Sequence, residues 1–423
     1  MPTDNHPEVL VVGAGPVGLL TSLVLTRNGV RTRIIDAEHR TTAQSYACAL
    51  HPSSLCLLES LGLADEAIEL GHKVETITFY EGEIARTHLK LSDLPGRYPF
   101  VVVLEQAVLE NLLEQQLRRT GATVEWNHRL VSIKTRQNGV DAGVEKAGSS
   151  AQKPGKPHLT IPADFMVGAD GCNSTTRRLL RIHAGRAGSP RLFGVYEIET
   201  TEPVDSDIKV VLSESASAVL WPLAKNRCRW TLQLASAKVA GEFPRKERAR
   251  LINDRTRAEV QGIHELHDFL ARRVPWFPVQ KIGEMNWVAV VQFQPQLAPR
   301  FGHGRCWLAG DSVHQTSPAG MQSMNIGLRE GADLANKLKT ILRDKVGLQV
   351  LQAYNRVHQA HWRQLLGLRI LPRIPDSVLF WATRHLSTVV SAKEDKSSRR
   401  SFPLWARPYS RTTSAAYQLR VMT

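Results

Sequence analysis

Three glycines and an acid near the N-terminus have the spacing of a dinucleotide-binding loop. Gly13, Gly15 and Gly18 form the pattern G-x-G-x-x-G, and Asp36 follows roughly 20 residues later. In such a loop the first glycine permits a tight turn, the second admits a pyrophosphate close to the backbone, and the third lets a helix pack on a strand. A helix N-terminus favours the anion, and the acid accepts hydrogen bonds from ribose hydroxyls. The predicted chemistry is binding of an adenosine dinucleotide.

The surrounding residues supply the elements that this loop requires. A short apolar run at 9–12 predicts a buried strand, and leucines and valines at helical spacing from 19 to 25 predict a helix. Asn28-Gly29 ends that helix, and 32–35 predicts a second strand that stops at Asp36. A complete strand–helix–strand unit favours dinucleotide binding over an incidental glycine-rich turn.

Two later stretches place an acid in a turn directly after an expected strand. GADGCNSTTRR, at 168–178, contains Asp170 and Arg177, follows a strand at 165–167 and has Ser174 as a helix N-cap. LAGDSVHQTSP, at 308–318, places Asp311 at the tip of a buried strand. Helices are predicted at 51–61 and 104–119, strands at 123–134 and 141–146, a hairpin loop at 147–157, and further strands at 192–199, 208–212, 218–223 and 229–234.

Together the three motifs, in this order, resemble those of the FAD-dependent aromatic hydroxylases of the p-hydroxybenzoate hydroxylase type, the group A flavoprotein monooxygenases. The resemblance covers about the first 340 residues. It implies an α/β fold in which a Rossmann-like FAD-binding domain of the GR2 type is interleaved with a β-sheet substrate domain and followed by a C-terminal helical portion. The implied segments are FAD-binding domain at 1–80, 101–190 and 286–345, a substrate-domain hairpin at 81–100, a substrate-binding sheet at 191–285, and C-terminal helices with a basic tail at 346–423.

The resemblance also implies which residues bind the flavin nucleotide. They are Gly13, Gly15, Pro16, Val17, Gly18, Asp36, Gln106, Asp170, Arg177, Gly310, Asp311, Pro318, Gly320, Met321 and Asn325. Asp311 matches the acid that bonds the ribityl chain, and 318–325 matches the segment along the isoalloxazine ring, where a helix N-terminus would stabilise the anionic reduced flavin. No catalytic residue and no metal ligand is assigned.

Several of these positions have a second interpretation. Asp170 either contacts the cofactor or holds its own turn, and Arg177 either serves that motif or is a surface helix residue. Gln106 is either a flavin ligand or an ordinary residue at a helix N-terminus. His314 is interpreted as structural, since a lone histidine beside a strand tip is more often a turn residue than a catalyst.

The sequence departs from the family pattern at positions near the expected flavin. Tyr46 and Ser53 stand where relatives often have arginine, and Met321 and Ser323 stand in a segment that relatives fill with more glycine. The later acid of the family appears as Glu330.

The implied reaction uses NAD(P)H and O₂ as co-substrates. Reduced FAD would form a C4a-hydroperoxyflavin that hydroxylates a phenolic, polyketide or quinone-like small molecule. Two alternatives stay open: a flavin-dependent oxidoreductase or halogenase of the same fold, and a flavin-binding protein with weak activity. Polar candidates on the substrate sheet are Tyr196, Arg229 and His264, while core packing is favoured for Trp221, Trp230 and Trp287.

Composition sets the remaining expectations. The 423 residues carry 54 Lys and Arg against 40 Asp and Glu, a net charge of +14, but the basic residues are scattered and no nucleic-acid-binding spacing accompanies them. Basic residues from Lys393 onward form either a solvated end, which such a run more often is, or a tail in weak contact with a membrane surface. Five separated cysteines, no signal segment and no apolar run of membrane-spanning length predict a cytoplasmic protein, peripheral to a membrane at most.

Overall fold

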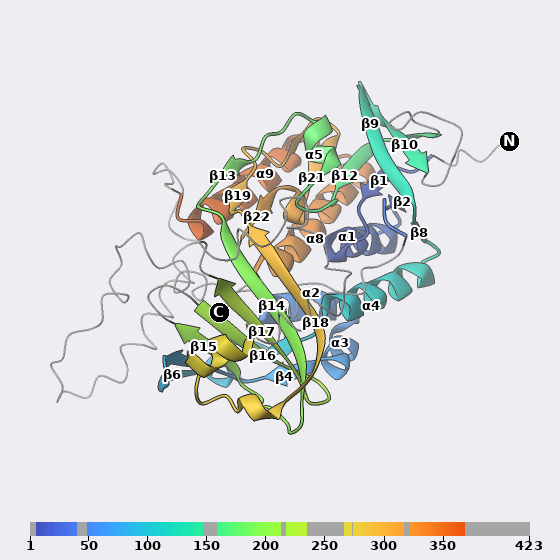
Figure 1. Cartoon of the computed structure of the whole chain (residues 1–423). Coiled ribbons are helices and arrows are strands. Elements are labelled where there is room, and N and C mark those ends of the chain that lie inside the picture. The colour runs from blue at the N-terminus through green and yellow to red at the C-terminus, as the bar shows by residue number, and fades with distance from the viewer. Residues whose placement is uncertain are drawn as a thin grey trace, which may run out of the picture.

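The computed structural model describes residues 6–39, 49–146, 159–212, 217–234, 266–272, 274–316 and 322–368 (Figure 1). One sheet, with strand order β20-β21-β12-β1-β2-β8, joins distant parts of the chain, and all its neighbours run parallel except β20 and β21. Its strands are β1 (Val9–Val12), β2 (Thr32–Ile35), β8 (Val124–Glu125), β12 (Phe165–Gly168), β20 (Gly302–His303) and β21 (Cys306–Leu308). Because parallel strands end at one edge, the three motif turns that follow β1, β12 and β21 meet there.

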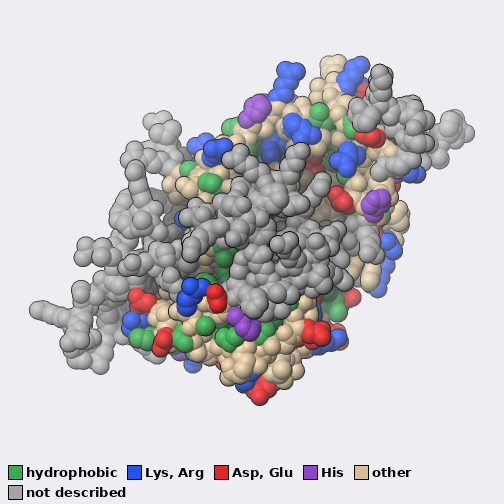
Figure 2. All heavy atoms as spheres, viewed as in Figure 1, with side chains coloured by type: hydrophobic (Ala, Val, Ile, Leu, Met, Phe, Trp, Pro, Cys, Tyr) green, Lys and Arg blue, Asp and Glu red, His purple; other side chains and the backbone are tan. Residues whose placement is uncertain are grey.

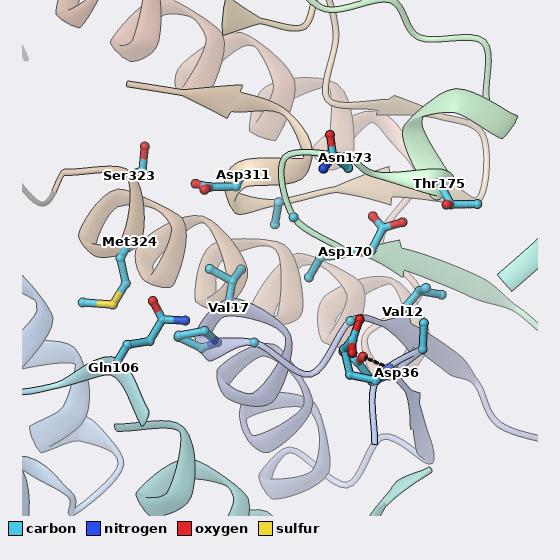
Figure 3. A pocket seen from close by; sticks show the side chains of 18 of the residues that line it. Val12, Val17, Asp36, Gln106, Asp170, Asn173, Thr175, Asp311, Ser323 and Met324 are labelled. Atoms are coloured by element: carbon cyan, nitrogen blue, oxygen red, sulfur yellow. Dashed lines mark hydrogen bonds between the residues drawn. The ribbon is translucent and has the colours of Figure 1, made fainter. Parts of the chain in front are cut away.

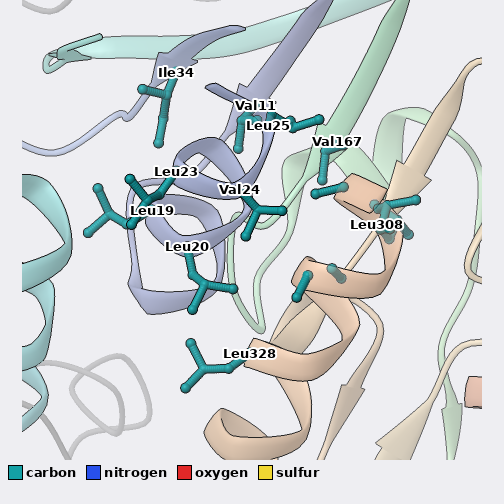
Figure 4. Close-up of a cluster of buried hydrophobic side chains, with 14 of the residues drawn as sticks. Val11, Leu19, Leu20, Leu23, Val24, Leu25, Ile34, Val167, Leu308 and Leu328 are labelled. Carbon is teal, nitrogen blue, oxygen red and sulfur yellow. The ribbon is translucent and has the colours of Figure 1, made fainter. Parts of the chain in front are cut away.

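The predicted strand–helix–strand unit is confirmed. β1 and β2 have the expected bounds, and α1 (Pro16–Arg27) begins with proline in its first turn, where a missing N–H leaves no helical bond unmade. All four residues of β1 are buried. Figure 4 shows Leu19, Leu20, Leu23 and Leu25 of α1 within the core that also contains β1, β2, β12 and β21.

Two long helices pack against α1. They are α4 (Gln106–Arg119) and α8 (Gln322–Arg343). A Cβ at Gly331 would lie 2.4 Å from Thr21 Oγ1, and a Cβ at Gly327 would lie 2.9 Å from Val17 Cγ2 and 3.1 Å from the Cα of Gly310. These two glycines therefore bring α8 close to both α1 and the turn after β21.

A second large sheet has the order β18-β14-β17-β16-β15-β5-β6. Its strands are β5 (Thr76–Glu81), β6 (Ile84–Lys90), β14 (Arg191–Thr200), β15 (Ile208–Leu212), β16 (Ser217–Leu223), β17 (Arg227–Leu234) and β18 (Ile282–Phe293). The four strands predicted between 192 and 234 are thus confirmed. An early hairpin, β5–β6, extends the sheet through a parallel pairing of β5 with β15. The domain boundaries themselves stay a prediction.

Smaller elements complete the described chain. Three sheets of three strands are formed by β3 (Ala49–Leu50), β7 (Val101–Val103) and β4 (His72–Val74); by β11 (Leu159–Ala163), β10 (Gly139–Lys146) and β9 (His128–Arg136); and by β13 (Gly185–Arg186), β19 (Gln296–Leu297) and β22 (His314–Gln315). Further helices are α2 (Pro52–Ser60), α3 (Ala64–Leu70), α5 (Thr175–Leu179) and α9 (Gln349–Leu365), with short 3₁₀ turns η1 (Leu91–Asp93), η2 (Val279–Lys281) and η3 (Gly310–Ser312). Residues 266–272 are also helical. The predicted loop at 147–157 lies outside the described residues.

The surface charge and the basic C-terminal tail are relevant to the expected contact with a membrane. On the face shown in Figure 2, blue Lys and Arg side chains are spread over the upper part of the molecule and mix with red acidic ones along the lower edge. No helix within the described residues is long and apolar enough to cross a membrane. The basic tail for which membrane contact was expected lies outside the described residues.

Candidate functional site

A cavity of about 500 Å³ opens at the edge where β1, β12 and β21 end and where α1 and α8 begin. The predicted site residues that line it are Gly13, Gly15, Pro16, Val17, Asp36, Gln106, Asp170 and Asp311. Figure 3 shows Asp36 at one end, Gln106, Met324 and Ser323 toward the other, and Val17 and Asp311 between them. The elongated arrangement suits a long ligand with a polar middle.

The glycine-rich loop is shaped by two different demands. Gly13 has a φ of +106°, and a Cβ there would lie 2.3 Å from the carbonyl oxygen of Ala169. A Cβ at Gly18, which does not line the cavity, would lie 1.8 Å from the carbonyl oxygen of Gly13. Gly15 differs: its φ is −71°, and a Cβ there would meet no described atom within 4 Å. The fold requires glycine at 13 and 18, whereas no contact within the described chain requires it at 15.

Asp36 closes one end of the cavity. Its Oδ2 accepts a hydrogen bond from the Ala14 backbone N–H at 2.6 Å, and its Oδ1 accepts one from the Glu38 N–H at 2.8 Å. The backbone N–H of His128 donates to the Asp36 carbonyl at 2.7 Å, which brings His128 and Arg129 to the same end. Each carboxylate oxygen has a second lone pair, so Asp36 holds the loop and can still accept a ribose hydroxyl.

The middle motif joins two turns of the cavity wall. Asp170 accepts hydrogen bonds from Ser174 Oγ at 2.5 Å and from the Thr176 N–H at 2.8 Å, while it also lines the cavity. Ser174 is the N-cap of α5, as predicted, and accepts from the Arg177 N–H. Asp170 therefore holds its own turn, and its contact with a cofactor stays a prediction.

Arg177 does not line the cavity but connects the middle motif to the last one. Its guanidinium donates to the carbonyl oxygen of Ser312 at 2.7 Å and to that of Cys172 at 2.8 Å. Arg177 is half-buried, and its interpretation as a plain surface residue is wrong because both carbonyls depend on it.

We expect Arg177→Met to lower the free energy of unfolding by about 1–3 kcal/mol, because two carbonyls lose a charged donor. Thermal unfolding followed by circular dichroism measures the change. Arg178→Met is the matched control, since the neighbouring Arg178 is exposed and its side chain bonds only to Thr175 Oγ1 among the contacts described. Equal melting temperatures for the two variants would contradict the bridging role.

Asp311 stands in η3, directly after β21. Among the described residues none donates a hydrogen bond to its carboxylate, which points into the cavity (Figure 3). Burial raises the pKa of Asp311; the charge of His314 opposes this shift and that of Glu330 adds to it. Gly310 does not line the cavity; its φ is +67°, and a Cβ there would lie 2.9 Å from Val17. The turn thus presents one acid that lacks a donor from the described chain.

The start of α8 forms the opposite wall, through Gln322, Ser323 and Met324. The Asn325 side chain points elsewhere: its Oδ1 accepts from the His51 N–H at 2.8 Å and its Nδ2 donates to the Ala49 carbonyl at 2.9 Å. Asn325 is therefore a tether between α8 and residues 49–54. Pro318, Gly320 and Met321 lie outside the described residues, as does Tyr46, while Ser53 is exposed in the first turn of α2.

Gln106 is the first residue of α4 and lines the far end of the cavity. Its Nε2 donates to Glu110 Oε1 at 2.7 Å, a contact within the first turns of the helix. Its position suits a ligand contact, which stays a prediction.

The candidate substrate residues fall on different faces of the seven-stranded sheet. Tyr196 and Trp230 are fully buried in one core and Trp221 in another, which confirms core packing for both tryptophans. Arg229 is buried beside Trp287 and donates to Glu197 at 2.6 Å. His264 lies outside the described residues.

Comparison with known proteins identifies the family to which this fold belongs. A family model described as "FAD binding domain" matches residues 6–367. This chain belongs to that FAD binding domain family. Among solved structures, p-nitrophenol 4-monooxygenase from Pseudomonas putida superposes with a TM-score of 0.70 at 21% identity, covering 85% of this chain and 86% of that one. Aklavinone-11 hydroxylase, solved with FAD and aklavinone, gives 0.67 at 23% identity, covering 85% and 67%.

Curated relatives of this FAD binding domain protein carry monooxygenase names. 6-Methylpretetramide 4-monooxygenase of Streptomyces rimosus is 30% identical over 84% of this chain and 59% of its own length. Pentachlorophenol 4-monooxygenase of Sphingobium chlorophenolicum is 27% identical over 85% of this chain and 63% of its own length. The chain thus spans less than two thirds of the length of these two relatives.

The cavity fits FAD on three observations of this structure. Gly15 leaves open space at the N-terminus of α1, a position that would suit a pyrophosphate. Asp36 offers lone pairs that would suit a ribose, and Asp311 offers a carboxylate without a donor from the described chain. Sequence reasoning missed the lining residues His128, Arg129 and Phe293. The stretch WNHRL at 126–130 was visible, but only the pairing of β8 with β2 brings it beside Asp36.

Proposed function

We propose that this protein is an FAD-dependent monooxygenase that uses NAD(P)H and O₂ to hydroxylate a phenolic, polyketide or quinone-like small molecule. The names of the relatives support the reaction class. Bound FAD would supply hydride acceptance from NAD(P)H and activation of O₂. The residues of this chain bind and orient the cofactor and the aromatic ring.

The observation that carries the proposal is the junction of the dinucleotide cradle with the seven-stranded sheet. Phe293, the last residue of β18, lines the same cavity as Gly15 and Asp311. Its ring makes an edge contact with Phe193 at 5.9 Å, and Val195 and Val291 extend this apolar cluster along β14 and β18. An aromatic ring in the cavity wall, backed by a buried apolar cluster, suits an aromatic substrate and limits the access of water.

In this arrangement the chain has three tasks. The N-terminus of α1, left open by Gly15, binds the pyrophosphate, and Asp36 and Asp311 accept hydrogen bonds from hydroxyl groups at either side of it. Phe293 orients the ring of the substrate by apolar contact, and its buried neighbours hold Phe293 in place. No base is assigned: Arg229, which lies over the Trp287 ring of this cluster, is bonded to Glu197.

We expect purified protein to contain FAD, or to bind it when reconstituted, and to oxidise NAD(P)H faster when the correct phenol is present. A panel of phenols and hydroxylated polycyclic compounds, read out by NAD(P)H oxidation with parallel assay of hydrogen peroxide, checks this expectation. Faster oxidation with little peroxide indicates coupled hydroxylation. Absence of anaerobic flavin reduction by both NADH and NADPH would favour a flavin-binding protein and contradict the proposal.

A further inference from the structure

The carboxylate of Glu330 is fully buried behind the turn that presents Asp311. Its Oε2 accepts a hydrogen bond from the Gly310 backbone N–H at 3.0 Å and lies 2.7 Å from His314 Nε2. Its Oε1 accepts a hydrogen bond from Trp362 Nε1–H at 2.7 Å. One side chain of α8 therefore bonds the turn after β21, the strand β22 and the helix α9.

The α9 side of this cluster is also closely fitted. The indole of Trp362 stacks on the His314 ring, with centroids 3.7 Å apart and planes 20° apart. His358 Nδ1 lies 3.9 Å from Glu330 Oε1, and His358 Nε2 lies 2.9 Å from Asp333. Trp362 is fully buried. The position of α9 is thereby tied to Glu330.

An ionised carboxylate without solvent is costly unless donors satisfy it. Burial, the largest single contribution, raises the pKa of Glu330. The charges of His314 and His358 and the hydrogen bonds from His314 and Gly310 together outweigh it, so the net shift is downward. Glu330 therefore stays ionised in the folded protein. The cluster supplies enough partners to hold this buried negative charge. The charge lies directly behind the turn that presents Asp311, where it accepts the hydrogen bond from the Gly310 N–H.

We propose that Glu330 is a positioning residue for FAD, which fixes the turn of Gly310 and Asp311 and makes that contact depend on α9 through Trp362. The proposal rests on the assignment of Asp311 as a cofactor contact made above. Gly310 has a φ of +67°, and its Cα lies against Gly327 of α8, the helix that also carries Glu330. The turn therefore contacts α8 twice, through the Gly310 N–H and through the Gly310 Cα. Loss of the carboxylate would release the N–H contact.

Glutamine at 330 tests the charge with little change of shape. Both oxygens of Glu330 accept hydrogen bonds from groups that can only donate, the Gly310 N–H and the Trp362 Nε1–H. A glutamine must turn its own NH₂ toward one of them, which leaves two donors facing each other. Asp333→Asn is the matched control: the same change on the same helix, in contact with α9 through His358 but not with Gly310.

The experiment titrates FAD into apo-protein of each variant and follows the quenching of flavin fluorescence. We expect Glu330→Gln to weaken FAD affinity about tenfold, the loss of one hydrogen bond to a charged group, and Asp333→Asn to change it less than about threefold. Thermal unfolding of the apo-proteins separates this effect from a loss of fold.

The pH dependence of FAD affinity supplies a readout that a merely structural role would not move. The titratable groups that act on Asp311 are His314 on β22, Glu330 on α8 and Cys172 beside the turn. The charge of Glu330 raises the pKa of Asp311, so Glu330→Gln should shift the loss of FAD affinity in acid to lower pH. Asp333→Asn should leave that midpoint unchanged.

Trp362→Phe keeps an aromatic ring against His314 but removes the Nε1–H that donates to Glu330. This variant takes the place of Glu330→Gln in the experiment if Glu330→Gln does not fold. We expect it to weaken FAD affinity about threefold to tenfold. Equal FAD affinity and equal pH midpoints in wild type, Glu330→Gln and Trp362→Phe would overturn the proposal. Failure of the wild type to bind FAD would instead contradict the proposed function, so the two failures are distinct.

Discussion

Gly15→Val is expected to weaken FAD binding by roughly 100-fold or more, because a branched side chain would fill the space that the pyrophosphate needs. The apo-protein itself should fold. The φ of −71° at Gly15 is one that valine adopts, and a Cβ there meets no described atom within 4 Å. The change at a helix N-cap costs about 1 kcal/mol of stability. Flavin fluorescence titration and apo-protein melting measure the two effects.

Gly18→Ala provides the contrast. A Cβ at Gly18 would lie 1.8 Å from the carbonyl oxygen of Gly13, so α1 must move away from the loop. We expect the melting temperature of this apo-protein to fall clearly, together with its FAD content. If Gly15→Val loses stability as much as Gly18→Ala does, or binds FAD as wild type does, the cavity beside Gly15 is not the pyrophosphate site.

Asp311→Ala is expected to weaken FAD binding by about 10- to 100-fold, since hydrogen bonds to a charged group contribute about 1.5–3 kcal/mol. The carboxylate faces the cavity and receives no hydrogen bond from the described residues, so we expect a ribityl hydroxyl to donate to it. Unchanged FAD affinity in Asp311→Ala would remove Asp311 from the site.

The pH dependence of this variant has a defined sign. Burial raises the pKa of Asp311 above its unfolded value, so its ionised form destabilises the folded apo-protein at neutral pH. Asp311→Ala should therefore melt higher than wild type at pH 7, and the difference should shrink as pH falls toward about 4, the ordinary value of an aspartate. FAD affinity should fall in acid for wild type and stay flat for the variant. A lower melting temperature at pH 7 would contradict the assigned burial.

The sequence predicted what is local. β1, α1 and β2 follow from a run of apolar residues, the spacing of leucines and an Asn-Gly stop, and the structure has these elements where the pattern placed them. Ser174 as an N-cap is equally local. The resemblance of the motifs to a known family also predicted that distant segments come together. Local patterns cannot predict this, because β12 pairs with β1, and β21 with β12, across long sequence separations.

The residues that escaped prediction act across long sequence separations. Arg177 reaches the carbonyl of Ser312, and Asn325 ties α8 to His51, neither of which a spacing rule reveals. His314 has the structural role that the sequence predicted, but its partners could not be predicted, because Glu330 and Trp362 come from two other elements. Such side chains look like ordinary helix or turn residues until the fold brings their partners to them.

Incubation of the FAD-loaded protein with NAD(P)H, an active phenol from the panel and ¹⁸O₂ tests the central claim most directly. Mass spectrometry of the product separates oxygen transfer from dehydrogenation. The proposed monooxygenase predicts one ¹⁸O atom in each product molecule, with the other reduced to water. Product without ¹⁸O, formed while NAD(P)H is consumed, would contradict hydroxylation by this protein.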